Sequence, residues 1–322
     1  MNGLTLRHLR YFAALARHGH FGRAAAACSI SQPALSVQMK ELEALVGAPL
    51  IERSTRQIRL TRLGEALAER AQDILHAVDE VEDLARAASD MMAGRLRIGV
   101  IPTIAPYLLP ALIKDLTLRF PALDIRPREA ITQTLINELL DMTLDVAIVA
   151  LPVSEPSLHE ETLFDEEFVL VRPLTDAAKP VPPAERLREM RLLLLEEGHC
   201  FRDQALSFCN IGQATPRDLM EGSTLATLVQ MVGVGIGVTL IPEMAVQTET
   251  GSAAVSVARL ARPRPKRRIG MVWRGTSPLA PHLAQMAETL RQMHMAGRIG
   301  SRAQPGSSEM VDTVAAATAS SE

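Results

Sequence analysis

Two cysteines near the middle of the chain are the residues whose type and spacing most suggest chemistry. Cys200 and Cys209 are separated by eight residues in the sequence GHCFRDQALSFC. His199 precedes the first cysteine, and Arg202 and Asp203 follow it. A thiolate reacts quickly with oxidants, and a neighbouring cation or a helix N-terminus favours the thiolate over the thiol. Cys200 is therefore a candidate reactive thiol.

The local pattern places both cysteines on one helical segment. Leu192–Leu195 predicts a buried strand, Gly198 ends it, and Gln204–Phe208 is typical of a helix. Nine positions along a helix give a rise of about 13.5 Å and put the two side chains on opposite faces. A disulfide needs Cα atoms within about 7 Å, so a bond between Cys200 and Cys209 would require the helix to unwind. Closing this loop would favour the bonded form by about 2.7 kcal/mol in the chain-entropy model, which predicts a two-state redox switch.

An ordinary packing role is the alternative for these residues. Cysteines in soluble chains are usually small buried hydrophobic residues, and the spacing is not the CxxC of thioredoxin-like proteins. The third cysteine, Cys28, is expected only to pack. An odd total of three cysteines fits a reducing compartment, where a disulfide would be a transient signal.

The composition limits the class of protein. A chain of 322 residues predicts two or three domains, and 47% hydrophobic residues can build sizeable cores. No apolar run reaches the roughly 18 residues of a membrane span, and the first residues lack the apolar core of a signal peptide. We therefore expect a cytoplasmic protein that binds no membrane. We also expect no cofactor, no bound metal and no enzymatic activity.

The charge is distributed unevenly along the chain. The net charge of −3 combines a basic first segment with an acidic remainder. Residues 1–62 carry nine Lys/Arg against three Asp/Glu. A basic segment attached to an acidic body indicates that one domain meets a polyanion.

The basic segment has the pattern of a helix-turn-helix followed by a wing. We expect helices over Leu6–Ala16 and Phe21–Ala27, and a third that begins at the cap Ser31 and ends at Val46. Leu50–Thr61 predicts two short strands around a turn. A solvated three-helix bundle is the alternative. The residues expected to contact DNA are Ser31, Gln32, Pro33, Ser36, Val37 and Lys40 on the third helix, with Arg53 and Arg56 in the wing.

These residues carry a family resemblance. The run AAAACSISQPALSVQMKELEALVGAPLIERSTRQIRLT within Leu6–Thr61 resembles the winged helix-turn-helix of the LysR-type transcriptional regulators. The resemblance implies a DNA-binding domain over residues 1–61. After it, a linker helix over 62–90 carries an apolar heptad seam, which predicts dimerisation. The seam consists of Leu67, Ala71, Ile74, Val78, Val81, Ala85 and Ala88.

The acidic remainder alternates strands and helices, which predicts an α/β body with a parallel sheet. It resembles the two Rossmann-like lobes of periplasmic binding proteins, the effector domain of the LysR family. We expect this body over 91–300, with one lobe about 94–164 and 267–300 and the other about 165–266. Ligands in such folds bind between the lobes, where Thr103 and Thr132 should point. Residues 301–322 are expected to be a disordered tail.

Within that family the body resembles the hydrogen-peroxide sensors, on stretches such as IGVIPTIAPYLLP (98–110), GHCFRDQALSFC and RRIGMVWR (267–274). The resemblance implies that Cys200 reacts with peroxide and that Cys209 resolves the product. It also implies a peroxide site lined by Thr103, Thr132, His199, Asp203 and Arg267, of which Arg267 would lower the thiol pKa. The chain departs from the pattern at Asn210–Asp218, directly after Cys209.

The resemblance further implies several partners. These are promoter DNA, RNA polymerase, a dimer of dimers of the chain itself, hydrogen peroxide as signal, and a thioredoxin- or glutaredoxin-type reductant. Such a protein would be an activator or repressor of oxidative-stress genes. Two alternatives remain open: a LysR-type regulator that responds to a small organic effector between the lobes, and a thiol peroxidase.

Overall fold

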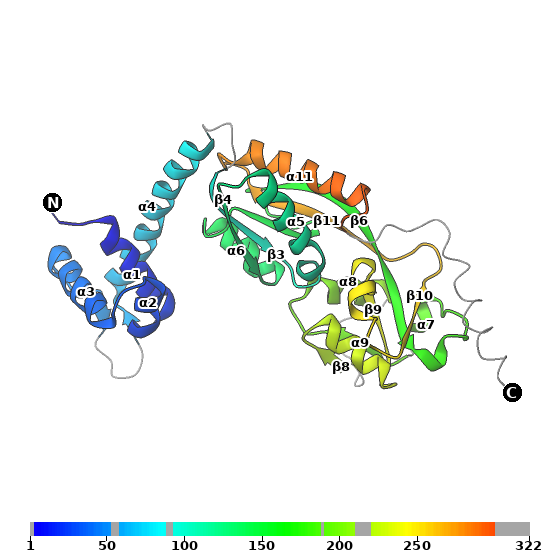
Figure 1. The fold of residues 1–322 in the computed structure, drawn as a ribbon. Coiled ribbons are helices and arrows are strands. Elements are labelled where there is room, and N and C mark those ends of the chain that lie inside the picture. Colours follow the sequence, from blue (N-terminus) through cyan, green and yellow to red (C-terminus); the bar gives the residue numbers. More distant parts are fainter. Residues whose placement is uncertain (1–2, 53–57, 88–92, 188–189, 210–219, 300–322) are drawn as a thin grey trace. The chain divides into compact units, whose positions relative to one another are not determined.

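A computed structural model describes residues 3–52, 58–87, 93–187, 190–209 and 220–299 (Figure 1). The chain divides into two compact units, Met1–Ala88 and Ser89–Glu322. The predictions for Arg53, Arg56, Asn210–Asp218 and the tail 301–322 lie outside the described residues. Within the described part, no helix is both long enough and apolar enough to cross a membrane.

The three helices predicted for the first unit are confirmed: α1 (Leu6–His18), α2 (Phe21–Ala27) and α3 (Gln32–Val46). Gly19 ends α1 in the left-handed conformation, with φ at 57°, which glycine adopts without steric cost. The hydroxyl of Ser31 caps α3 by accepting the backbone N–H of Ala34 at 3.3 Å. The core beneath these helices contains Phe12, Leu15, Ala24, Ala25, Leu35, Met39, Leu42 and Leu50.

A short wing follows α3, as predicted. Strands β1 (Ile51–Glu52) and β2 (Arg59–Leu60) pair antiparallel. The carboxylate of Glu43 on α3 accepts the backbone N–H groups of Leu50 at 2.8 Å and Ile51 at 3.3 Å. This carboxylate therefore fixes the wing to the third helix of a winged helix-turn-helix.

The long helix α4 (Arg62–Ala87) starts after Thr61, whose hydroxyl accepts the N–H of Gly64 at 3.0 Å. The prediction that the whole seam of this helix faces another chain is wrong at its beginning. Leu67 packs on the core of its own unit and Ala71 is fully buried, because α4 packs against α1. Further along, Ile74 is 44% and Val81 64% exposed. The exposed stripe therefore begins at about Ile74.

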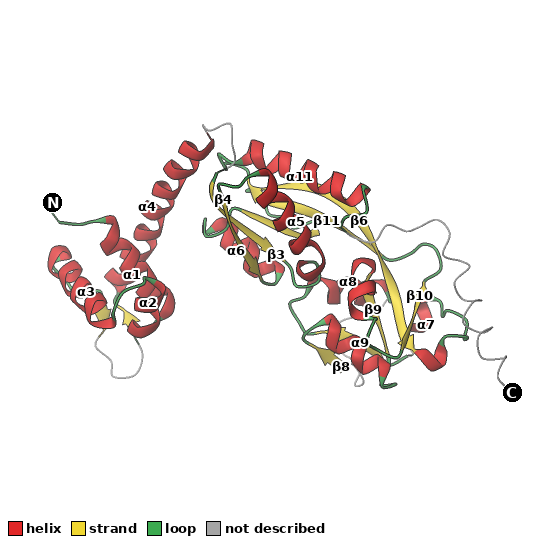
Figure 2. Cartoon of the chain, viewed as in Figure 1, coloured by secondary structure: helices red, strands yellow, loops and turns green. Residues whose placement is uncertain are grey.

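The second unit is built on a nine-stranded sheet of order β4-β3-β5-β11-β6-β9-β7-β8, with β10 paired to β6 (Figure 2). The first lobe contains β3 (Gly94–Val100), α5 (Ala105–Arg119), β4 (Leu123–Glu129), α6 (Thr132–Leu140), β5 (Val146–Leu151) and α11 (Ala280–Met295). The second lobe contains α7 (Ala184–Leu187), β7 (Leu192–Leu195), α8 (Cys200–Phe208), β8 (Met220–Gly222), α9 (Leu225–Gly233), β9 (Val238–Pro242), α10 (Val246–Glu249) and β10 (Val255–Arg259). The predicted α/β class is confirmed.

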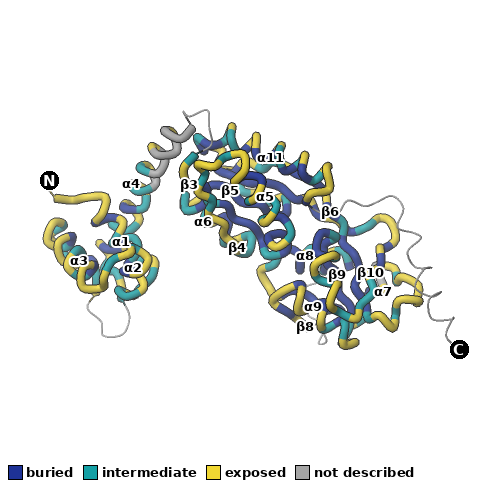
Figure 3. The backbone as a smooth tube through the Cα atoms, viewed as in Figure 1, coloured by how far each residue is buried: buried dark blue, intermediate teal, exposed yellow. Residues whose placement is uncertain are grey.

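Two strands run between the lobes. The first part of β6 (Leu158–Pro173) pairs with β11 (Lys266–Arg274), and its last part pairs with β9 and β10. Each lobe has its own hydrophobic core on this shared frame (Figure 3). Our sequence analysis identified neither the full length of β6 nor the strand β10.

Replacing Glu43 by alanine tests the link between the wing and α3. We expect Glu43→Ala to lower the free energy of unfolding of the first unit by about 1–2 kcal/mol, because two backbone N–H groups lose a charged acceptor. Urea unfolding followed by circular dichroism measures the change. Glu41→Ala is the matched control, since Glu41 is exposed on the same helix. Equal losses in both variants would contradict the proposed link.

Candidate functional site

The helix α8 separates the two cysteines, as the sequence predicts. Gly198 turns the chain from β7 into α8 with φ at 92°, and Cys200 is the first residue of the helix. Cys209 follows the last helical residue, and its N–H donates to the carbonyl of Ala205. Both thiols are free. A helix of nine residues holds its ends about 13 Å apart, well beyond disulfide reach.

The environments of the two thiols differ. Cys200 is half-buried, and its side chain packs against the core of the first lobe although α8 belongs to the second. Cys209 is fully buried in the core of the second lobe. Burial raises the pKa of the Cys209 thiol to about 11. Cys209 is therefore an unreactive thiol while α8 is intact.

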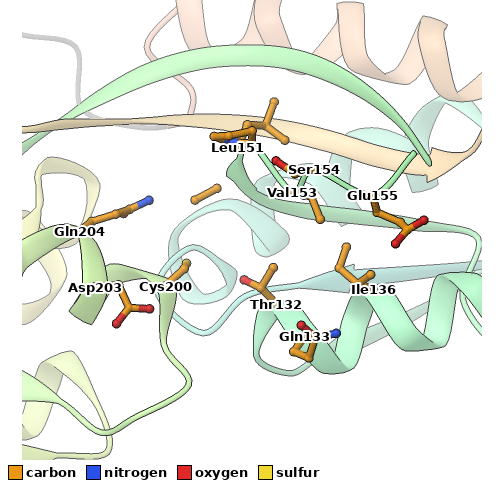
Figure 4. Close-up of a pocket in the computed structure, with 12 residues that line it drawn as sticks. Thr132, Gln133, Ile136, Leu151, Val153, Ser154, Glu155, Cys200, Asp203 and Gln204 are labelled. Atoms are coloured by element: carbon orange, nitrogen blue, oxygen red, sulfur yellow. The ribbon is translucent and has the colours of Figure 1, made fainter. Parts of the chain in front are cut away.

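Cys200 lies at the edge of a pocket of about 370 Å³ between the lobes. Asp203 and Gln204 of α8 line one side, and Thr132 with its neighbours on α6 lines the facing side (Figure 4). The remaining lining residues come from the end of β5 and the connection after it, and include Leu151, Val153, Ser154 and Glu155. The pocket brings Cys200 together with two residues of the predicted peroxide site, Thr132 and Asp203.

Two polar atoms from pocket-lining residues have no partner among the described residues. The hydroxyl oxygen of Thr132 and the amide oxygen of Gln204 are both buried and accept no hydrogen bond. Buried polar atoms normally have a partner, so these two oxygens are unsatisfied acceptors near Cys200, and each side chain must turn toward the pocket before its oxygen can accept a hydrogen bond from a bound molecule. Gln204 is four residues after Cys200, which puts both side chains on one face of α8. Our sequence analysis missed Gln204, although this spacing could have identified it.

Thr103 and Arg267, also predicted for the site, form a separate buried network. The guanidinium of Arg267 donates to the hydroxyl of Thr103 at 2.7 Å, to the carbonyl of Thr103 at 3.0 Å and to Glu166 at 2.8 Å. The second carboxylate oxygen of Glu166 accepts the N–H of Met244 at 3.1 Å. These contacts balance the charge of Arg267 and fix its orientation.

This network contacts α8 through Phe201, the residue next to Cys200. The Arg267 guanidinium lies 5.4 Å from the ring centre of Phe201, a cation–π contact. Arg267 is buried, whereas its neighbours Lys266 and Arg268 are exposed and pair with Asp165. The alternation at the start of β11 therefore identifies Arg267, rather than Lys266 or Arg268, as the cation that faces inward there.

Glu166 is a second residue that our sequence analysis missed. It lies opposite Arg267 in the antiparallel pair of β6 and β11. Both side chains are almost completely buried, at 5% and 0% exposure. The sequence could have indicated Glu166, because it lies two positions from both Phe164 and Phe168. An acidic residue at this spacing shares the buried face of a strand with the two phenylalanines.

His199 and Asp203 flank the start of α8. His199 occupies the N-cap position, where its side chain makes no capping bond, and burial lowers its pKa despite the opposing charge of Glu196. The ring is therefore favoured in the neutral form at neutral pH. Asp203 is exposed in the first turn, where a carboxylate interacts favourably with the helix dipole.

The candidate DNA-contacting residues lie on the first turns of α3. Ser31, Gln32, Pro33 and Lys40 are exposed and Val37 is 54% exposed, whereas Ser36 is half-buried. Ser31 has a capping role as well, because its hydroxyl holds the helix start. The two arginines predicted for the wing are outside the described residues.

The different burial of the two thiols gives a testable difference in reactivity. At pH 8 a pKa of about 11 leaves about one Cys209 in a thousand as thiolate. Brief iodoacetamide treatment of the reduced protein, followed by peptide mass spectrometry, should modify Cys200 at least tenfold faster than Cys209. The raised pKa also affects the stability of the fold. Burying the neutral Cys209 thiol stabilises the folded protein fully below the ordinary thiol pKa of about 8.5, and this stabilisation is lost as the pH rises through about 11. In denaturant, Cys200 and Cys209 should react with iodoacetamide at similar rates. Similar rates in the folded protein would contradict the burial of Cys209.

Comparisons with known proteins give a consistent result. Residues 6–65 match the bacterial regulatory helix-turn-helix protein family, lysR family, and residues 89–294 match the LysR substrate binding domain. A probable hydrogen peroxide-inducible genes activator of Streptomyces viridosporus is 43% identical, over 89% of this chain and 94% of that protein. The DNA-binding transcriptional dual regulator OxyR of Escherichia coli K12 is 39% identical, over 89% of this chain and 95% of the regulator.

Solved structures agree with these matches. A full-length OxyR of Pseudomonas aeruginosa with a cysteine-to-aspartate substitution has a TM-score of 0.70 and 36% identity, covering 95% of this chain and all of that one. A hydrogen peroxide-bound OxyR of Corynebacterium glutamicum with a cysteine-to-serine substitution has a TM-score of 0.62 and 35% identity, covering 91% and 93%. With both its DNA-binding and substrate-binding regions matched, the chain belongs to the LysR family of bacterial regulators.

Proposed function

We propose that this chain is a DNA-binding transcriptional regulator that hydrogen peroxide switches through a reversible disulfide between Cys200 and Cys209. The main supporting observation is the intact helix between a half-buried cysteine in a polar pocket and a fully buried second cysteine. The relatives named as peroxide-inducible activators and the peroxide-bound neighbour support the choice of oxidant. The regulated genes would then be those of the oxidative-stress response.

The disulfide forms in two steps, oxidation of Cys200 and condensation with Cys209. The Cys200 thiolate attacks one oxygen of hydrogen peroxide, the O–O bond breaks, and a sulfenic acid and hydroxide form. The thiol of Cys209 then attacks the sulfenic sulfur, so that a disulfide forms and water leaves. A thioredoxin- or glutaredoxin-type dithiol would reverse the switch by thiol–disulfide exchange.

Each site residue has a role consistent with its contacts. The unpartnered oxygens of Thr132 and Gln204 would accept hydrogen bonds from the peroxide once these side chains turn toward it. Arg267, fixed by Thr103 and Glu166, contacts Phe201 in the first turn of α8 and so helps to position the start of the helix that carries Cys200. His199 in its neutral form orients the oxidant or transfers a proton. Asp203 lines the pocket beside the sulfur.

Forming the disulfide disrupts α8 in specific ways. Cys209 must leave the core of the second lobe, and the first turn must release Arg202. The Arg202 guanidinium donates to the Leu195 carbonyl at 2.9 Å and to Glu221 at 2.7 Å. Breaking these contacts costs free energy and so opposes formation of the disulfide.

The regulator acts on promoter DNA in the cytoplasm as a symmetric oligomer that contacts RNA polymerase. The exposed stripe from Ile74 to Val81 on α4 would pair two chains, so that two recognition helices read two half-sites. Two such dimers would form the dimer of dimers. The oxidised and reduced forms would then differ in how these chains assemble on the promoter.

A second function is favoured by the size of the pocket. About 370 Å³ exceeds the volume of a hydrogen peroxide molecule several-fold and falls within the range of about 300–1,000 Å³ for organic ligands. A regulator that binds a small organic effector there would not need either cysteine.

The two functions differ in their response to cysteine substitution. We expect Cys200→Ser and Cys209→Ser each to abolish the change in promoter footprint on peroxide addition, because the disulfide cannot form. Intact-mass measurement should show the loss of two hydrogens only in the unsubstituted protein and in the control Cys28→Ser. An unchanged peroxide response in Cys200→Ser would refute the proposal and leave the organic effector as the better candidate.

The oligomer can be tested on the exposed stripe of α4. We expect Ile74→Asp/Val81→Asp to convert the dimer to a monomer and to weaken promoter binding at least about tenfold, since two linked half-site contacts become independent. Analytical ultracentrifugation and fluorescence anisotropy measure these effects. Leu174→Asp, at a side chain 57% exposed on the body, is the control and should remain oligomeric. A dimer in the double variant would exclude this stripe as the main contact.

A further inference from the structure

The charged residues that line the Cys200 pocket are of one sign. Among its described lining residues, the charged side chains are Glu155 and Asp203, and both are acidic. Glu196 and Glu197 lie exposed just before the N-cap of α8, with no ion-pair partner among the described residues. The carboxylate of Glu155 accepts the hydroxyl of Ser157 at 2.8 Å, which leaves its charge intact. We call these four residues the acidic collar.

The cations closest in sequence or contact to α8 are already paired. Arg267 forms its buried ion pair with Glu166, and Arg202 pairs with Glu221. The lowered pKa of His199 favours its neutral form at neutral pH. The positive end of the α8 dipole, about half a charge, is opposed by Asp203 in the first turn. The described charges around the pocket therefore sum to a negative value.

We propose that the acidic collar makes the pocket selective for neutral hydroperoxides and disfavours anionic oxidants at Cys200. A charged molecule that enters a low-dielectric pocket interacts with each fixed charge more strongly than in water. An anion is repelled by every collar residue, whereas a neutral peroxide is not. The selectivity rests on the proposed reaction of Cys200 and adds the substrate class to it.

Two oxidants that differ in charge allow a direct comparison. Hydrogen peroxide is neutral, and peroxymonosulfate is a monoanion at neutral pH. The thiolate takes one oxygen from either molecule as the O–O bond breaks. The products are a sulfenic acid with hydroxide in the first case and a sulfenic acid with sulfate in the second. The covalent change at sulfur is the same with either oxidant. The ratio of the rate constants for peroxymonosulfate and hydrogen peroxide at Cys200, divided by the same ratio for free cysteine, therefore reports the effect of the pocket.

Glu155 is the residue to change, because it lines the pocket from the first lobe and does not belong to the predicted peroxide-binding residues. We expect Glu155→Gln in the full-length reduced protein to raise the anion-to-peroxide rate ratio about threefold at low ionic strength. The difference should shrink at high salt, where the repulsion is screened. Glu155→Asp keeps the charge and should retain the original ratio. Rates come from trapping the sulfenic acid with dimedone and quantifying the Cys200 peptide.

Asp141→Asn is the matched control. It removes one negative charge from the exposed residue that follows α6, about 13 Å along that helix from Thr132. An equal ratio in Glu155→Gln and the unsubstituted protein, or the same rise in Asp141→Asn, would overturn the inference while leaving the proposed function intact. If Cys200 reacted with neither oxidant, the proposed function would fail, and the inference with it.

Discussion

The intact helix α8 keeps two sulfur atoms apart, and its two ends pack against different cores. Cys200 contacts the core of the first lobe, whereas Cys209 is part of the core of the second. A helix of nine residues cannot bring its ends within disulfide distance. Any bond between these cysteines therefore changes both the helix and its packing between the lobes, which is why a local oxidation can have a structural consequence.

The buried ion pair of Arg267 and Glu166 lies where the lobes share strands. Both residues belong to the paired strands β6 and β11, and Arg267 reaches Thr103 before α5 and Phe201 on α8. Removing one member of a buried pair leaves an uncompensated charge, so such networks hold their partners in one arrangement. The network thus couples the first lobe to the turn that carries Cys200. Its geometry depends on sheet register across about one hundred residues of chain.

Features set by neighbouring residues in the sequence could be predicted, whereas features set by contacts between distant residues could not. The helices of the first unit were predictable because their caps, Ser31 and Gly19, and their apolar spacing are local. The position of Cys200 at a helix start was predictable for the same reason. Glu166 and the strand β10 were not, because strand pairing with distant residues decides their roles. The burial of Leu67 and Ala71 was missed because an apolar seam does not reveal which of two surfaces it meets.

The contacts of Arg202 suggest how a change in α8 extends to the sheet. Arg202 ties the first turn of α8 to the end of β7 and, through Glu221, to β8. β8 is three residues long and forms the edge of the sheet, paired on one side with β7. A short edge strand has few hydrogen bonds of its own, so this side-chain contact adds to the pairing with β7 that holds it. Unwinding the first turn of α8 would remove this anchor at the sheet edge, in addition to the Phe201 contact with Arg267 on the shared strands.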